Sequence, residues 1–257
     1  MANLYYDPGQ GRAANVRDLF GRIAPHYDLI NNLQSLGLHH RWKSRLAKLA
    51  VPDAAPPSTR RVLDLCCGTG DIAFRVSRRG AVAIGIDFSE AMLRFARQRA
   101  TLVPAPTFIR GDALALPFPN QSFDAVTIGY GLRNLASFER GIAEMIRVVK
   151  PGGQLLILDF ACPENLLWRA IYTGYLRFVV PAIGKLIAGD AAAYGYILES
   201  LRHYPSIEGI KGILRSQGCG EINIQRILGG AMSIHAARTP APSAGTPQDL
   251  GAPHRTR

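Results

Sequence analysis

The sequence has few cysteines, and none of them forms a recognisable site. The four are Cys66, Cys67, Cys162 and Cys219, and their spacing does not match that of metal ligands. Cys66 and Cys67 are adjacent in a tight turn, which suits neither zinc nor a disulfide bond. We therefore expect no bound metal, no disulfide framework and a location in the reducing cytoplasm.

The sequence also lacks the long apolar runs that mark membrane insertion or export. No segment approaches the ~18 uncharged residues that suggest a membrane-spanning helix. Residues 1–7 do not have the basic and then apolar pattern of a signal peptide. We therefore expect a chain without a membrane span.

Acidic residues are scarce relative to basic ones. There are 19 Asp and Glu residues against 30 Lys and Arg residues, which gives a net charge of +11. Such a charge suits nucleic acid, an anionic membrane surface or a plain solvated surface. The chain has no long run of like charge and no nucleic-acid motif. We therefore rank the solvated surface first and peripheral contact with a membrane second, and we expect no nucleic-acid partner.

What is present is a globular composition organised around residues 61–71. The 257 residues, 47% hydrophobic and 19% charged, fit one α/β domain with additions. Val62–Leu65 predicts a buried parallel strand, and the turn Gly68-Thr69-Gly70 leads into a helix over 71–79. A helix N-terminus placed after such a turn binds nucleotides. A turn that merely joins strand to helix is the alternative interpretation.

Two details of this loop favour S-adenosylmethionine (SAM) over a dinucleotide. Ala73 stands where a dinucleotide-binding motif has its third glycine. Asp64 lies inside the strand just before the turn, where a carboxylate repels a pyrophosphate and attracts the ammonium group of a methionine moiety.

Further acidic residues follow the next strands. Asp87 ends a strand over 81–86 and is suited to accept both hydroxyls of a ribose, while Ser89 is better placed to cap the helix that runs to about residue 100. Asp112 follows a strand over 107–110 and is suited to accept a hydrogen bond from the adenine amine. The predicted cofactor-binding residues are Asp64, Gly68, Thr69, Gly70, Asp87, Asp112, Ala113 and Gly129.

The alternation of strands and helices predicts a doubly wound, mostly parallel α/β fold. Further strands are expected over 122–128 and 154–160, with a helix over 137–149 and a turn at 150–153 between them. Strands over 221–226 and 231–237 then close the sheet as an antiparallel pair, which makes seven strands in all.

Residues 1–52 are predicted to form a helical lid that precedes the SAM-binding α/β domain, residues 53–238. A helix over 13–28 should end near Pro25. Residues 27–42 carry many hydrogen-bonding side chains. They form either a capped loop that leads into a helix over 38–50 or a lid over a substrate pocket.

The segment 164–217 is predicted to be a helical insertion after the fifth strand. Residues 164–188 are apolar and rich in aromatics, and Pro181 should kink them. They form either core packing or a hydrophobic tunnel or membrane-facing surface for an apolar substrate. Helices are expected over 191–201 and 206–217, and residues 239–257 are expected to be disordered.

These motifs resemble those of class I SAM-dependent methyltransferases, through residues 64–70, 85–87, 111–113 and 149–153. More narrowly, the pattern over 27–42 is similar to one signature of the ubiquinone/menaquinone biosynthesis C-methyltransferase family. The pattern from Arg147 to Asp159 resembles its second signature, and residues 131–134 are typical of the family. The resemblance runs from about Val16 to Ala237.

The resemblance implies C-methylation of a polyprenylated quinol, with demethylmenaquinol as the first expectation. Alternatives are a methoxy-polyprenyl-benzoquinol of the ubiquinone route and a small molecule methylated on oxygen or nitrogen. A catalytically silent SAM-fold protein and an NAD-dependent reductase are further rivals, and Asp64 disfavours the reductase. The candidate assembly is a homodimer.

Five residues are candidates for catalysis. Arg133 and Asn134 follow the fourth strand, beside the expected methyl group, and the arginine should stabilise a developing phenolate because it stays protonated. Tyr27, Asp28 and His39 are alternative bases, and His39 has a suitable intrinsic pKa.

The sequence departs from the family pattern at two positions. Ile30 stands where Met is usual and Asp159 where Glu is usual, which shortens the reach of that carboxylate.

Overall fold

The computed structural model describes residues 12–53, 59–100, 105–189 and 191–240. The predicted disordered tail therefore lies outside the described residues, except for its first two positions. Residues 54–58, which precede the first strand, also lie outside them.

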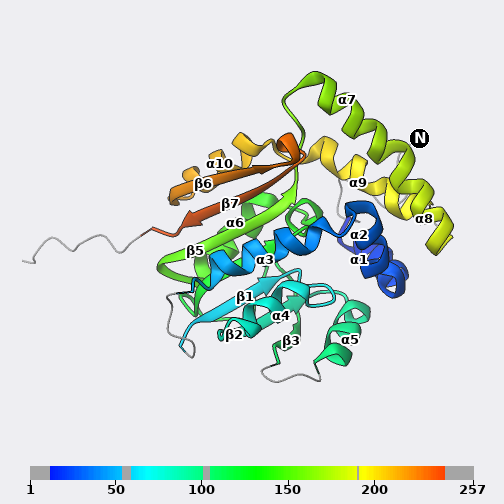
Figure 1. The fold of residues 1–257 in the computed structure, drawn as a ribbon. Helices are drawn as coiled ribbons and strands as arrows, with labels where there is room; N and C mark the ends of the chain where they lie inside the picture. The colour runs from blue at the N-terminus through cyan, green and yellow to red at the C-terminus, as the bar shows by residue number, and fades with distance from the viewer. Residues whose placement is uncertain (1–11, 54–58, 101–104, 190, 241–257) are drawn as a thin grey trace, which may run out of the picture.

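The centre of the molecule is a seven-stranded sheet in the order β3-β2-β1-β4-β5-β7-β6 (Figure 1). All neighbouring strands are parallel except β7, which runs antiparallel to β5 and β6. The predicted fold class and the antiparallel closing pair are confirmed. The strands are β1 Arg61–Leu65, β2 Val82–Asp87, β3 Thr107–Arg110, β4 Phe123–Gly129, β5 Val149–Phe160, β6 Gly220–Ile227 and β7 Met232–Arg238.

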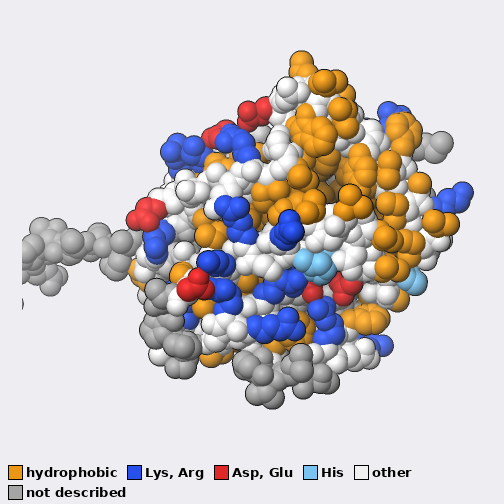
Figure 2. Space-filling view, in the orientation of Figure 1, with side chains coloured by type: hydrophobic (Ala, Val, Ile, Leu, Met, Phe, Trp, Pro, Cys, Tyr) orange, Lys and Arg blue, Asp and Glu red, His pale blue; other side chains and the backbone are white. Residues whose placement is uncertain are grey.

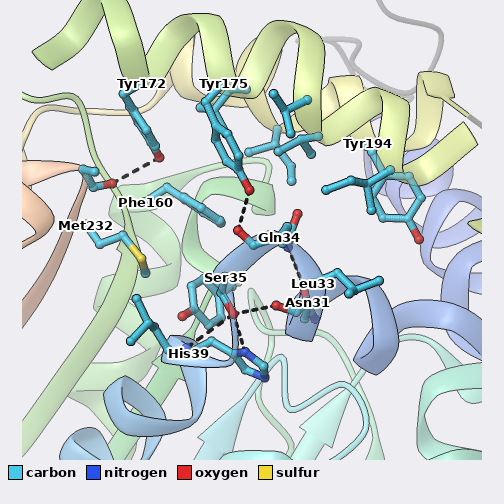
Figure 3. Close-up of a pocket in the computed structure, with 18 of the residues that line it drawn as sticks. Asn31, Leu33, Gln34, Ser35, His39, Phe160, Tyr172, Tyr175, Tyr194 and Met232 are labelled. Carbon is cyan, nitrogen blue, oxygen red and sulfur yellow. Dashed lines mark hydrogen bonds between the residues drawn. The ribbon is translucent and has the colours of Figure 1, made fainter. Parts of the chain in front are cut away.

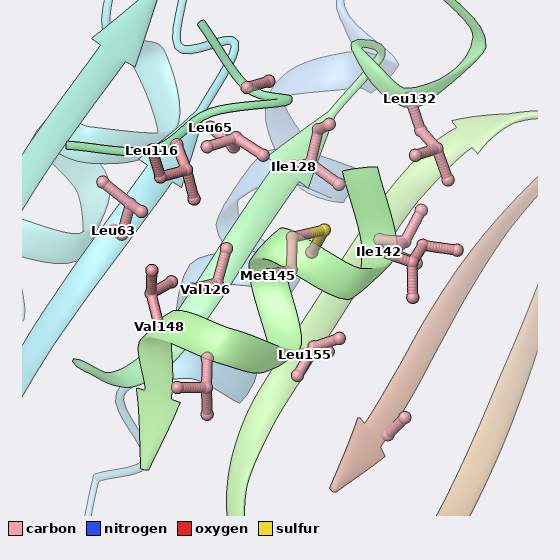
Figure 4. Close-up of a cluster of buried hydrophobic side chains, with 14 of the residues drawn as sticks. Leu63, Leu65, Leu116, Val126, Ile128, Leu132, Ile142, Met145, Val148 and Leu155 are labelled. Carbon is pink, nitrogen blue, oxygen red and sulfur yellow. The ribbon is translucent and has the colours of Figure 1, made fainter. Parts of the chain in front are cut away.

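Helices cover both faces of the sheet because its central strands are apolar on both sides. Val62 of β1 packs in a cluster with α3 (Leu38–Ala50) and α4 (Asp71–Arg78). Its neighbour Leu63 points the other way and packs in a cluster with α6 (Phe138–Val148) and α10 (Ile207–Ser216). Figure 4 shows this second cluster, in which side chains of α6 lie on β4 and β5. Helix α5 (Glu90–Arg99) follows β2.

Strand β5 begins earlier than predicted. The turn expected at residues 150–153 lies inside the strand, which starts at Val149. The pairing of β5 with β4 has a register irregularity between Phe123 and Ala125, and Gly152 has a φ of +70° there. The glycines therefore form a bulge within a strand rather than a turn before one.

The amino-terminal segment is helical almost throughout. Helix α1 (Arg12–Ile23) ends just before Pro25, a 3-10 turn covers Ala24–His26, and α2 spans Tyr27–Ser35. The interpretation of residues 27–42 as a capped loop was wrong, because they are helical as far as Ser35 and the chain reverses only after that residue. Leu36 and Gly37, with φ values of 49° and 75°, turn the chain into α3.

The helical insertion packs against this amino-terminal segment. The part that does so consists of α7 (Leu166–Gly174), a π-helical turn (Tyr175–Val179), α8 (Val180–Ala188) and α9 (Ala191–His203). The last helix of the insertion, α10, packs on the sheet instead. The irregularity predicted from Pro181 takes the form of this π-helical turn, which lies just before the proline. Ile30 of α2 lies with no exposed surface in a cluster with Leu176 and Val180, so the apolar swap at position 30 is a buried packing position.

One helix of this insertion bears on the expectation that the chain has no membrane span, which stays a prediction. The helix over 166–187 is long and apolar enough to cross a membrane by length and composition, and only 17% of its apolar window is buried. Three cations, Arg169, Arg177 and Lys185, interrupt the apolar run in the sequence without ending the helix. Figure 2 shows hydrophobic side chains gathered over α7 and down the neighbouring edge of the molecule, while Lys and Arg gather over α3 and α4.

Candidate active site

The loop between β1 and α4 holds several residues in the left-handed conformation. Cys66, Gly68 and Gly70 have φ values of 51°, 56° and 84°. A Cβ atom on Gly70 would lie 2.6 Å from the ring of Phe108, so the loop passes close to β3 only because this residue has no side chain. The bare main chain at Gly68 then forms part of a cavity wall.

Asp64 lies beneath this loop. Its carboxylate accepts hydrogen bonds from the Ala73 amide (3.1 Å) and the Thr127 hydroxyl (2.8 Å). The side chain is 1% exposed, and burial raises its pKa to about 7. Among the described residues, Asp64 does not line either of the two cavities discussed below. Through these two hydrogen bonds, Asp64 links α4 and β4 to β1.

A small cavity of about 100 Å³ lies at the carboxyl ends of β1, β2 and β4. Five of the eight predicted cofactor-binding residues line it, and the other three, Asp64, Thr69 and Gly70, do not. The five are Gly68, Asp87, Asp112, Ala113 and Gly129, and apolar walls come from Ile86, Phe88, Met92 and Leu135.

Asp87 ties the glycine loop to the next helix. Its carboxylate accepts hydrogen bonds from the amides of Gly68 (2.8 Å) and Ser89 (2.9 Å). Burial raises the pKa of Asp87 to about 6, although these N–H groups oppose the shift. Ser89 caps α5 by accepting from the Met92 amide, which confirms the capping role predicted for it.

The small cavity has the chemistry of a nucleoside site. The carboxylates of Asp87 and Asp112 supply acceptors for hydroxyl and amino groups, and the apolar walls suit a base. The side-chain oxygen of Asn134 is buried and has no hydrogen-bond partner among the described residues. An unpaired buried acceptor of this kind indicates a missing ligand donor.

A large cavity of about 460 Å³ lies between the insertion and the amino-terminal helices. Figure 3 shows Tyr172 and Tyr175 reaching down from the insertion towards Gln34, Ser35 and His39. Tyr175 donates to the Gln34 carbonyl (2.5 Å). The walls are otherwise mainly aromatic and aliphatic, as the tunnel interpretation of residues 164–188 requires.

The two cavities adjoin. Phe20, Tyr27 and Tyr130 line both of them, so a ligand in one cavity meets a ligand in the other at this shared wall. Burial raises the pKa of Tyr27 well above its usual value. Its hydroxyl is therefore protonated at neutral pH and can donate a hydrogen bond.

Arg133 lines the large cavity, and most of its donors are already occupied. The guanidinium donates to Asp159 (2.6 Å), to the Tyr130 carbonyl (2.7 Å) and to the Tyr196 hydroxyl (3.1 Å). Burial alone would lower the pKa of Arg133, but Tyr196 and Asp159 raise it. Asp159 is 1% exposed and does not line either cavity. The unusual Asp159 thus serves to hold Arg133.

His39 lines the large cavity in an electrically neutral state. Its Nδ1 lies 2.6 Å from the Ser35 hydroxyl. Burial and the nearby Lys43 lower its pKa to about 3, far below the intrinsic value that made it a candidate base. His39, His40 and Asp71 bring ligand atoms within 4.8 Å of one another. However, Asp71 is already paired with Lys43 and with two arginines, and these cations oppose a metal ion.

Asp28 points to the glycine loop and lines neither cavity. It accepts a hydrogen bond from the Thr69 hydroxyl (2.9 Å) and pairs with Arg99 (3.4 Å). Arg99 also donates to the Thr69 carbonyl and to Asp71, and Lys43 of α3 pairs with Asp71 at 2.8 Å. Two helices of the amino-terminal segment are therefore tied to the loop by charged groups.

The sequence profile of the ubiE/COQ5 methyltransferase family matches residues 9–239. The chain belongs to this family. It is a SAM-dependent methyltransferase with the seven-stranded sheet described above.

Individual relatives agree with this assignment. The demethylmenaquinone methyltransferase of Thermus thermophilus is 40% identical over 225 residues, which cover 86% of this chain and 100% of that protein. The ubiquinone/menaquinone biosynthesis C-methyltransferase UbiE of Methylobacterium nodulans is 38% identical over 241 residues, 92% of this chain and 94% of that one.

A solved structure supports the fold alone. Magnesium protoporphyrin IX methyltransferase from Synechocystis, with bound S-adenosylhomocysteine, superposes with a TM-score of 0.63 at 21% identity. The match covers 88% of this chain and 99% of that one.

Several residues of the site were not predicted from the sequence of this chain. Tyr130, Tyr172 and Tyr196 line the large cavity, but they are distant in sequence from one another and belong to different elements. The aromatic density of residues 164–188 was a signal for Tyr172. For Tyr196, which lies 63 positions from its partner Arg133, the sequence held no signal.

Proposed function

We propose that the protein transfers the methyl group of SAM to a ring carbon of a polyprenylated quinol, with demethylmenaquinol as the first candidate. The observation that carries this proposal is the junction of the two cavities. A small polar cavity for the cofactor meets a large apolar cavity at Tyr27 and Tyr130. The names of the relatives support the substrate class.

We assign cofactor binding to the residues that line the small cavity. Asp87 faces the ribose, Asp112 the adenine amine, and the main chain at Gly68, Ala113 and Gly129 the remaining edges. Thr69 and Gly70 act indirectly, by shaping the loop, and Asp64 by holding it from below. When bound, SAM supplies an electrophilic methyl group on its sulfonium.

In the proposed mechanism, Arg133 acts through Tyr196. The Tyr196 oxygen accepts a hydrogen bond from the Arg133 guanidinium (3.1 Å). The hydroxyl proton of Tyr196 therefore points away from Arg133 and can be donated to a ring oxygen in the cavity. Loss of the quinol hydroxyl proton would place negative charge on its oxygen, where these donors would stabilise it. As the neighbouring ring carbon bonded to the methyl group, that charge would pass into the ring, the oxygen would become a carbonyl, and the bond between the methyl group and the sulfonium sulfur would break with its electrons left on sulfur. That carbon then loses its hydrogen as a proton, and the ring regains its aromaticity. Donors placed where charge develops lower the barrier.

A group must also accept the proton of the quinol hydroxyl. Of the candidates, Tyr27 is protonated, and Asp28 lies outside both cavities, which leaves His39. A pKa of about 3 makes His39 a weak base. We therefore expect His39→Asn to lower kcat by about tenfold, below the usual range for general-base catalysis.

We further propose that the exposed apolar face of the insertion contacts the cytoplasmic surface of a membrane. Leu166, Phe178 and Leu186 are 77%, 67% and 87% exposed, and exposed Leu36 and Ile171 border the large cavity. A prenyl tail can thus remain in the lipid while the ring enters the cavity. Interspersed cations suit anionic headgroups.

Vesicle flotation tests this face. Phe178→Ser combined with Leu186→Ser should abolish flotation with anionic vesicles, while Val82→Ser should not, although Val82 is also exposed (49%) but lies on β2. Equal flotation of all variants would contradict the proposal.

Light scattering in the same buffer tests the expected homodimer, and a monomer mass would reject it.

The reaction is tested with methyl-labelled SAM and chemically reduced quinols in detergent, read by mass spectrometry. Label on the ring carbon of demethylmenaquinol supports the proposal, and label also on the methoxy-polyprenyl-benzoquinol would mean that both routes are served. No label with intact SAM binding would favour the small-molecule methyltransferase, and loss of SAM binding would favour the silent protein. Asp112→Asn is the matched variant that should weaken SAM binding alone.

A further inference from the structure

Tyr130, at the carboxyl end of β4, has a backbone conformation that bulky residues rarely adopt. Its φ is +61°, in the left-handed region, and it stands between two glycines, Gly129 and Gly131. Such a conformation in a non-glycine residue is disfavoured and clusters at functional sites.

Hydrogen bonds hold this conformation from both sides. The Tyr130 amide donates to the Leu158 carbonyl (2.7 Å). Its carbonyl accepts from Arg133 (2.7 Å) and from the side chain of Asn134 (3.3 Å). The backbone of Tyr130 is therefore held in this conformation by residues of the site itself.

The side chain forms part of the wall that the two cavities share. Its ring lies 5.4 Å from that of Phe160, and the Lys43 ammonium lies 5.8 Å from the ring centroid. The hydroxyl is buried and has no hydrogen-bond partner among the described residues. An unpaired buried hydroxyl is unfavourable unless a ligand completes it.

The Tyr130 side chain lines both cavities, and its hydroxyl can donate a hydrogen bond. Burial is the main influence on its pKa, followed by Tyr27, Asp159, Arg133 and Tyr172. The net effect raises the pKa well above the usual value, so the proton is retained at neutral pH.

We propose that the Tyr130 hydroxyl donates a hydrogen bond to the ring oxygen next to the carbon that is methylated, and so sets the angle of the ring towards the methyl donor. The inference rests on the proposed function and adds a specificity-determining contact to it. The position at the shared wall carries the assignment, because the reacting carbon and its neighbouring oxygen must lie there.

Tyr130→Phe tests the proposal, because it removes one oxygen and keeps both the ring and the backbone. Binding is measured by fluorescence quenching in the presence of S-adenosylhomocysteine, with prenylated naphthols that carry or lack the oxygen next to the reacting position. We expect the variant to lose about tenfold in affinity for the first naphthol and nothing for the second, the effect of one neutral hydrogen bond. The kcat/KM for the quinol should fall by a similar factor.

Three controls distinguish this role from a structural one. The melting temperature of the ligand-free variant should not fall, because the hydroxyl that is removed has no partner there. The affinity for SAM should be unchanged, and Tyr204→Phe, a tyrosine that lines neither cavity, should leave all values at the wild-type level. Equal losses for both naphthols, no loss for either, or a parallel loss of SAM affinity would overturn the proposal. If the wild-type protein itself methylated no quinol, the proposed function would fail instead.

Discussion

The pair Arg133–Asp159 allows a prediction with a defined magnitude. The two charges lie 2.6 Å apart, with side chains 4% and 2% exposed. Asp159→Asn removes the negative charge and leaves the guanidinium buried without a counter-charge. Breaking a buried pair on one side costs about 3–5 kcal/mol, a large share of the ~5–15 kcal/mol that stabilises a typical domain.

Urea unfolding followed by circular dichroism measures this loss, with an unchanged m value as the sign that the same transition is observed. Glu164→Gln is the matched control, because Glu164 pairs with Arg226 at 3.3 Å on the surface, where a pair contributes about 0–1 kcal/mol. Removing both buried charges, with Arg133→Met added, should recover part of the loss. A loss below about 1 kcal/mol for Asp159→Asn, or no recovery in the double variant, would refute the reasoning.

Three further predictions concern the cofactor loop. Gly70→Ala should abolish SAM binding and lower the melting temperature, because the new Cβ would lie 2.6 Å from Phe108 at a φ of +84°; calorimetry that finds normal affinity would contradict this. The pKa of Asp87, raised to about 6, means that the folded protein holds this proton more tightly than the unfolded chain, so stability falls as pH rises from about 4 to 6. SAM affinity should rise over the same range, and Asp87→Asn should remove both dependences. Asp28→Asn should weaken SAM binding a few-fold by releasing Thr69, with no change in KM for the quinol, and an altered KM alone would place Asp28 at the substrate instead.

The sheet and five residues of the small cavity could be predicted because they depend on local signals. Strand ends in a parallel sheet gather at one edge, so Asp87 and Asp112 followed from position alone. The capping role of Ser89 was equally local. The helices of the insertion followed from their apolar period, although the π-helical turn did not.

The rest of the site depends on partners that are far apart in the chain. Asp28 meets Thr69, 41 positions later, and Arg99, 71 positions later, so its role as a tie to the loop left no local pattern. The lowered pKa of His39 results from burial that only the packed structure provides. The left-handed conformation of Tyr130 is likewise imposed by Leu158 and Arg133, and not by its own residue type.

The comparison of quinols with and without a prenyl tail tests the central claim most directly. In the proposed function, the apolar cavity of about 460 Å³ holds the tail while the ring reaches the shared wall. Each buried methylene contributes about 0.8 kcal/mol, so kcat/KM for the tailed demethylmenaquinol should exceed that of the tail-less ring by at least about 100-fold. Equal kcat/KM values for the two, at the same detergent concentration, would contradict the account.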